Sequence, residues 1–89
     1  MSDSLKQLIE FAEQHKEIDA IYKGTNPDGS GIVYYLIVKG LKFKDKINTK
    51  TLDLEMKLFP RSGTGIMCLP CTKTPEDCDF LKKCIYKRE

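Results

Sequence analysis

The pattern of apolar and polar positions is most informative between Ile32 and Phe59, where it predicts a long hairpin. Residues 32–38 are all apolar or aromatic, and all but Leu36 are β-branched or aromatic, which is typical of a central strand covered on both faces. Further along, apolar and charged residues alternate strictly, and side chains of a strand point alternately to opposite faces. This second arm is therefore predicted as a strand whose buried face carries four residues: Leu52, Leu54, Met56 and Leu58.

The flanking segments predict two more strands and a helix at each end. Apolar residues recur at helical spacing from Leu5 to Ala12, so we predict a helix from Ser4 to about Lys16. Short strands are predicted over residues 18–23 and 66–69. Residues 74–77, with the sequence Thr-Pro-Glu-Asp, are typical of a helix start, and this final helix would place Cys78, Leu81, Cys84 and Ile85 on one side.

These elements predict one small α+β domain spanning residues 1–89. The order is α-β-β-β-β-α: a four-stranded antiparallel meander flanked by an N-terminal and a C-terminal helix, both on one face of the sheet. A chain of 89 residues with 40% hydrophobic residues can bury a modest core. Because the polar N-terminus lacks a signal-peptide pattern and no apolar run approaches about 20 residues, we expect a cytoplasmic protein with no membrane partner.

The four cysteines are the residues best suited to metal binding or redox chemistry, and two, six and five residues separate them. Cys68, Cys71, Cys78 and Cys84 could together bind zinc, because four thiolates form a tetrahedral site. In the predicted helix, residues 78 and 84 differ by about 120° around the axis and roughly 9 Å along it, which favours buried structural thiols instead. A redox pair at Cys68 and Cys71 or two disulfides are the remaining interpretations.

The central strand gives the functional prediction. If both helices cover one face, Val33, Tyr35 and Ile37 are exposed on the other, beside Lys39. Soluble monomers rarely expose such a patch, so we predict a non-enzymatic interaction or regulatory protein that binds a protein partner, or itself, there. No catalytic arrangement of side chains stands out, since His15 is the only histidine.

The alternative function is a zinc-stabilised nucleic-acid-binding module. It would use lysines of the sheet and of the basic final helix, although a net charge of +2 with interspersed signs argues against a dedicated nucleic-acid binder. The lysines in question are Lys39, Lys42, Lys44, Lys82, Lys83 and Lys87.

Two family resemblances bear on this choice. The predicted α-β-β-β-β-α order is similar to the α-β-β-β-α order of double-stranded-RNA-binding domains, whose basic cluster at the start of the last helix is replaced here by residues 75–77, Pro-Glu-Asp. Residues 5–38 resemble the start of a minimal nucleotidyltransferase, with Gly24-Thr25 where that family has Gly-Ser. The metal-binding aspartates of that family are absent, and Tyr34 and Tyr35 stand in that region. This resemblance therefore implies no active enzyme.

Overall fold

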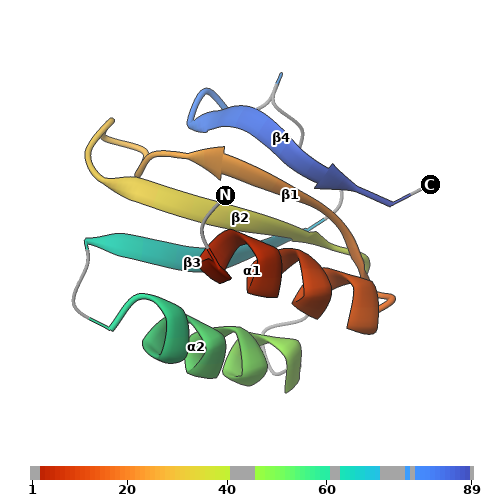
Figure 1. Ribbon diagram of the computed structural model, residues 1–89. Coiled ribbons are helices and arrows are strands. Elements are labelled where there is room, and N and C mark those ends of the chain that lie inside the picture. Colours follow the sequence, from red (N-terminus) through yellow and green to blue (C-terminus); the bar gives the residue numbers. More distant parts are fainter. Residues whose placement is uncertain (1–2, 41–45, 61–62, 71–75, 77, 89) are drawn as a thin grey trace.

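The computed structural model describes residues 3–40, 46–60, 63–70, 76 and 78–88. Two helices and four strands follow one another in the order α-β-β-α-β-β (Figure 1). Their bounds are α1 (Asp3–Gln14), β1 (Ile18–Gly24), β2 (Ile32–Val38), α2 (Lys46–Leu58), β3 (Thr64–Pro70) and β4 (Leu81–Lys87).

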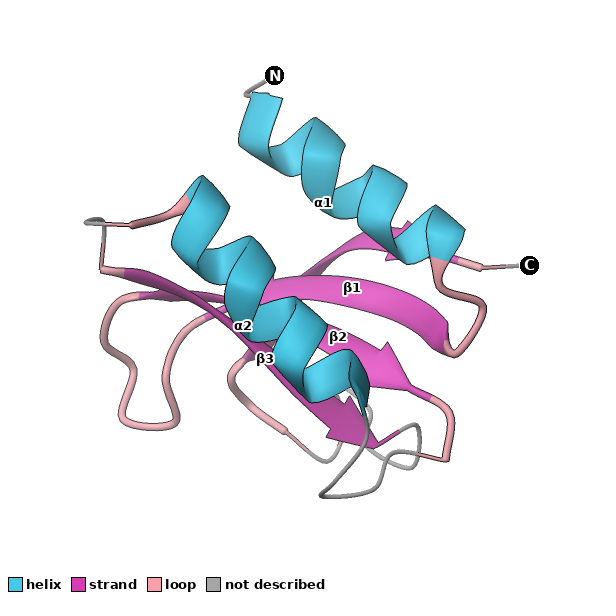
Figure 2. Ribbon diagram, turned by 90° about the horizontal axis from the view of Figure 1, so that it is seen from below, coloured by secondary structure: helices cyan, strands magenta, loops and turns pink. Residues whose placement is uncertain are grey.

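The strands form one mixed sheet in the order β3-β2-β1-β4. β1 pairs antiparallel with β2 and with β4, whereas β2 and β3 are parallel and joined through α2. Both helices lie on the same face of the sheet (Figure 2). The α+β class is thus confirmed, but the predicted antiparallel meander is wrong, because α2 lies between the second and third strands and lets β3 run parallel to β2.

The segment Lys46–Leu58 is a helix, so the strand predicted in its second half is wrong. Four apolar residues spaced two apart also form two pairs spaced four apart, and that is helical spacing. Leu54 and Leu58 pack against the core, whereas Leu52 and Met56 are exposed. Leucine, methionine, glutamate and lysine dominate this segment and favour helix, and no residue from 52 to 58 is β-branched.

The segment Leu81–Lys87 is strand β4, so the predicted final helix is wrong there. Most of the capping motif at 74–77 lies outside the described residues. β4 pairs along the free side of β1, and this pairing satisfies the backbone groups that face β1 in place of helical hydrogen bonds. Ile85 and Tyr86 suit a strand, so tertiary pairing and β-propensity together override the local helix signal.

The chain enters β4 by passing very close to Gly24. A Cβ atom on Gly24 would lie 1.8 Å from the carbonyl oxygen of Phe80. The amide of Thr25 donates to that same oxygen at 3.1 Å. Gly24 therefore permits an approach of two backbone segments that any side chain would block.

The sheet carries a core on each face. Between the helices and the sheet, Leu8 of α1 packs in one core with Ile21 and Leu36 of the sheet. On the opposite face, Tyr35 is the largest fully buried side chain, its ring 4.9 Å from that of Phe80. The Tyr35 hydroxyl donates to the carbonyl oxygen of Thr25 at 2.6 Å.

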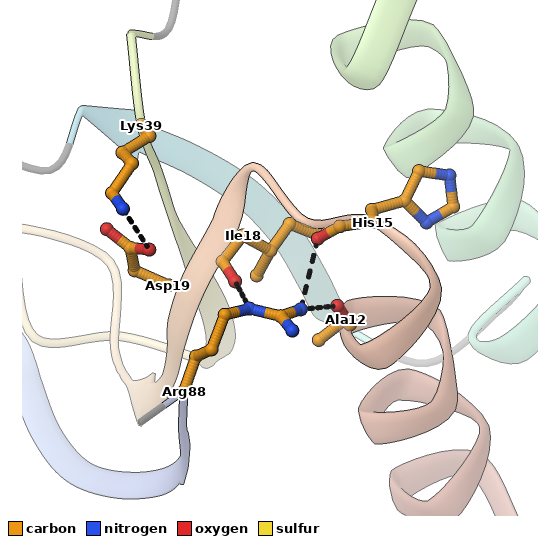
Figure 3. Close-up of polar contacts among 6 residues, drawn as sticks. All are labelled: Ala12, His15, Ile18, Asp19, Lys39 and Arg88. Atoms are coloured by element: carbon orange, nitrogen blue, oxygen red, sulfur yellow. Dashed lines mark hydrogen bonds and ion pairs between the residues drawn. The ribbon is translucent and has the colours of Figure 1, made fainter.

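Arg88, directly after β4, ties the end of α1 to the sheet (Figure 3). Its guanidinium donates to the carbonyl oxygens of Ala12, His15 and Ile18, the last at 3.0 Å. Its backbone amide donates to the carbonyl oxygen of Asp19 at 2.7 Å. The last carbonyls of a helix have no partner within the helix and attract cations, so Arg88 caps α1 from a distant part of the chain.

Candidate functional site: the edge strand β3 and helix α2

The residues predicted to form an exposed partner-binding patch are buried. Val33, Tyr35 and Ile37 are 3%, 1% and 5% exposed. The sequence analysis predicted that these residues lie on an uncovered face of the sheet. Instead, Cys78, Phe80 and Leu81 pack against Val33 and Tyr35 and form a second core on that face. Lys39 is exposed and forms an ion pair with Asp19 at 3.7 Å. The expected exposure of the three apolar side chains is therefore wrong.

The described cysteines do not converge on one point. Cys68 lies on β3 and Cys84 on β4, the two edges of the sheet, so three strand spacings, roughly 14 Å, separate them. Cys68 packs on the helix-covered face and Cys78 on the opposite one. Zinc requires four sulfurs each about 2.3 Å from the metal, so the predicted four-cysteine site does not fit this fold. Its fourth member, Cys71, lies outside the described residues.

No other metal cluster is found among the described side chains. Cys68, Cys78 and Cys84 form no disulfide with one another. Burial raises the pKa of the Cys68 thiol, and the hydrogen bond between its sulfur and the Thr51 hydroxyl, at 3.3 Å, only partly opposes this shift. A redox-active cysteine needs a lowered pKa, so the surroundings of Cys68 oppose that role.

Cys84 should therefore react with iodoacetamide at pH 7 faster than Cys68, by roughly tenfold or more, because Cys84 is exposed whereas burial shields Cys68 and raises the pKa of its thiol. Tandem mass spectrometry of a quenched time course assigns the label to each cysteine. The rate at Cys68 should rise as the pH is raised into the alkaline range, where its thiol ionises. Equal rates at the two cysteines at pH 7 would reinstate the redox interpretation.

The lysines proposed for nucleic-acid binding lie in separate places. Of these, Lys39 lines a depression of about 270 Å³ beside Glu17, where β2 ends and α2 begins, together with Lys46 and Lys50 of α2, which were not part of the prediction. The predicted basic helix is instead the edge strand β4, which holds Lys82, Lys83 and Lys87, and Lys42 and Lys44 lie outside the described residues. The described lysines thus form no single basic face.

The two edges of the sheet differ in charge. In the described part of the chain, β3 and β4 each have a strand neighbour on one side only. β4 carries three lysines, a common protection against unwanted strand pairing, whereas no residue of β3 is charged. Among the described strands, β3 is therefore the edge that lacks charged protection against pairing with another strand.

A groove of about 320 Å³ runs beside this edge, between β3 and α2. We call it the β3–α2 groove; Figure 1 shows the two elements side by side at the edge of the sheet. Four large hydrophobic side chains are exposed in the described residues, and Leu52, Met56 and Met67, at 54%, 66% and 48%, belong to α2 or β3. The groove lining is uncharged: Asn48, Thr51, Leu52, Ile66, Met67 and Cys68.

One charged side chain reaches the edge itself. The Glu55 carboxylate on α2 accepts a hydrogen bond from the backbone amide of Ile66 at 2.7 Å. Backbone groups of a strand point alternately to its two sides, so the amide of Cys68 faces the same free side as that of Ile66. Pro70, which has no amide hydrogen, ends the strand.

Sequence reasoning missed this site because it assigned α2 to a strand. Had residues 46–58 been assigned to a helix, Leu52 and Met56 would have fallen outside the stripe formed by Leu54 and Leu58. Two large apolar residues on the exposed side of an amphipathic helix are a recognisable signal for an interaction surface.

No protein-family model, curated protein or solved structure matches this chain. Among the described helices, none is long and apolar enough to cross a membrane.

Proposed function

We propose that this chain is a protein-interaction domain that takes up an extended segment of a partner protein as a fifth strand along β3. The observation that carries the proposal is an uncharged edge strand with an uncharged groove beside it, on a sheet whose other edge is protected by lysines. Strand addition is a common mode of peptide recognition, in which backbone hydrogen bonds give affinity and side-chain pockets give specificity.

The two faces of β3 define what the partner segment presents. Side chains of the added strand would alternate between the helix side, where the groove contains Leu52, and the opposite side, where Met67 is exposed on β3. Backbone groups would pair with the free side of Ile66 and Cys68. The fitting partner is therefore an extended segment with apolar residues on both faces.

This proposal keeps the protein-binding function predicted from the sequence and moves it to another surface. Val33, Tyr35 and Ile37 support the sheet from inside, whereas Leu52, Met56 and Met67 offer the exposed apolar area. Fully burying a side chain of this size contributes about 1.5–3 kcal/mol, so three partly exposed ones can supply a useful share of a micromolar affinity.

The experiment selects peptides from a random display library on the full-length protein and measures their affinity for purified variants. Met67→Asp and Leu52→Asp should each weaken binding by about tenfold or more, because each places a charge against the added strand, Leu52→Asp on the helix side and Met67→Asp on the opposite side. Cys84→Asp is the matched control, since it adds the same charge to an exposed position on the opposite edge strand. It should leave the affinity unchanged.

Three outcomes would contradict the proposal. The first is a selection that yields no peptide binding above background. The second is a set of peptides whose affinity falls with Cys84→Asp and not with Met67→Asp. The third is a concentration-dependent dimer in sedimentation equilibrium that Met67→Asp removes, which would assign the edge to a second copy of this chain.

A further inference from the structure

Glu55 occupies the free edge of β3 at the rung where a partner strand would pair. Its carboxylate accepts the Ile66 amide at 2.7 Å, so that donor is already satisfied in the isolated chain. Glu55 lies in the last turn of α2, where the negative end of the helix dipole disfavours a carboxylate. The hydrogen bond to the strand offsets this unfavourable position near the helix C-terminus.

Gly65 makes room for this contact. A Cβ atom on Gly65 would lie 3.1 Å from the Glu55 carboxylate oxygen, closer than ordinary packing allows. Gly65 has no positive φ that would demand glycine for the backbone conformation. Its small size instead allows the carboxylate to reach across the strand to the neighbouring amide.

The lysines of α2 lie away from the β3–α2 groove. The three lysines of α2 line other depressions, Lys46 and Lys50 at the start of the helix and Lys57 on the side towards α1. None of the residues that line the β3–α2 groove is charged. Glu55 thus supplies the negative charge beside β3, with no lysine of α2 lining that side.

We propose that Glu55 closes the β3 edge in the free protein and selects an incoming strand that carries a lysine or arginine. The strand's carbonyl oxygen takes over the Ile66 amide, and its basic side chain pairs with the released carboxylate. This inference rests on the proposed function, because it concerns which segment the same edge accepts. It adds a charge preference that the apolar groove alone does not give.

The exchange explains how an open edge remains selective. An apolar strand without a basic residue would displace the carboxylate and leave it without its hydrogen bond, beside a newly buried surface. A basic residue restores an ionic partner to the carboxylate, which favours the correct segment and penalises the others.

The test repeats the peptide selection on the wild type and on variants at position 55. Peptides selected on the wild type should be enriched in lysine and arginine, and replacing their basic residue by alanine should weaken binding about two- to fivefold, the range of a partly exposed ion pair. With Glu55→Gln this difference should vanish, since glutamine keeps a hydrogen-bond acceptor and loses the charge. With Glu55→Lys the selected peptides should become enriched in aspartate and glutamate.

Glu55→Ala separates the closing role from the charge. It removes the carboxylate from the Ile66 amide, so the alanine-substituted, uncharged peptide should bind about twofold tighter or better than it binds the wild type. Asp53→Asn is the matched control, because Asp53 is an exposed carboxylate on the same helix. It should leave both the peptide preference and the affinity unchanged.

Two failures are distinguishable. The role of Glu55 would be overturned if peptides bound at β3 with no preference for basic residues. It would also be overturned if Asp53→Asn removed that preference as fully as Glu55→Gln. Either result would leave the strand-addition function intact. Absence of binding to the wild type and also to Glu55→Ala, whose edge is open, would overturn the strand-addition function itself.

Discussion

Replacing Gly24 by alanine is expected to lower the free energy of unfolding by about 3 kcal/mol or more. The added Cβ would lie 1.8 Å from the carbonyl oxygen of Phe80, and a backbone atom cannot move aside as the end of a flexible side chain can. The start of β4 would have to shift, which would also break the hydrogen bond from the Thr25 amide to Phe80. Urea denaturation followed by circular dichroism measures the change.

Gly63→Ala is the control for this experiment, because a Cβ at Gly63 would meet no atom of the described residues within 4 Å and its φ is not positive. We expect it to change the free energy of unfolding by less than about 0.5 kcal/mol. If Gly24→Ala were as harmless as Gly63→Ala, the close passage of Phe80 over the end of β1 would be incorrect.

Tyr35→Ala is expected to destabilise the fold by about 3–5 kcal/mol, because it removes the largest fully buried side chain and leaves a cavity next to Phe80. Tyr35→Phe should cost only about 1–1.5 kcal/mol, since it keeps the ring and loses the hydrogen bond to the carbonyl oxygen of Thr25. Thermal and urea unfolding of both variants check the two values.

The sequence interpretation leads to the opposite expectation for Tyr35. If that ring were exposed on an open sheet face, alanine would leave stability almost unchanged and would weaken partner binding instead. A small loss of stability in Tyr35→Ala would therefore contradict the second core and favour the exposed face.

Local pattern was sufficient to predict α1, β1, β2 and β3. Each is a segment whose apolar period or β-branched content supports a single interpretation, and their observed bounds lie within a few residues of the predicted ones. The pattern failed where two periods coincide: alternation over residues 52–58 is also two sets of helical pairs, and only packing against the core determines which set is buried.

β4 and the second core depend on tertiary contacts that local sequence does not encode. The local signal before and within residues 81–87 favours a helix, and pairing with the free side of β1 overrides it. The burial of Val33 and Tyr35 follows from Cys78 and Phe80, which precede β4. The proposed site could not be predicted for the same reason: which strand forms an open edge depends on the order of strands in the sheet.

The most direct test of strand addition is amide hydrogen exchange of the full-length protein with and without a saturating selected peptide. The amide of Cys68 faces the free side of β3, so we expect its exchange to slow by at least about tenfold when the peptide binds. The amides of β4, on the opposite edge of the sheet, should keep their rates. Unchanged exchange at Cys68, with new protection at β4 or at the lysines around the start of α2, would show that the partner binds elsewhere.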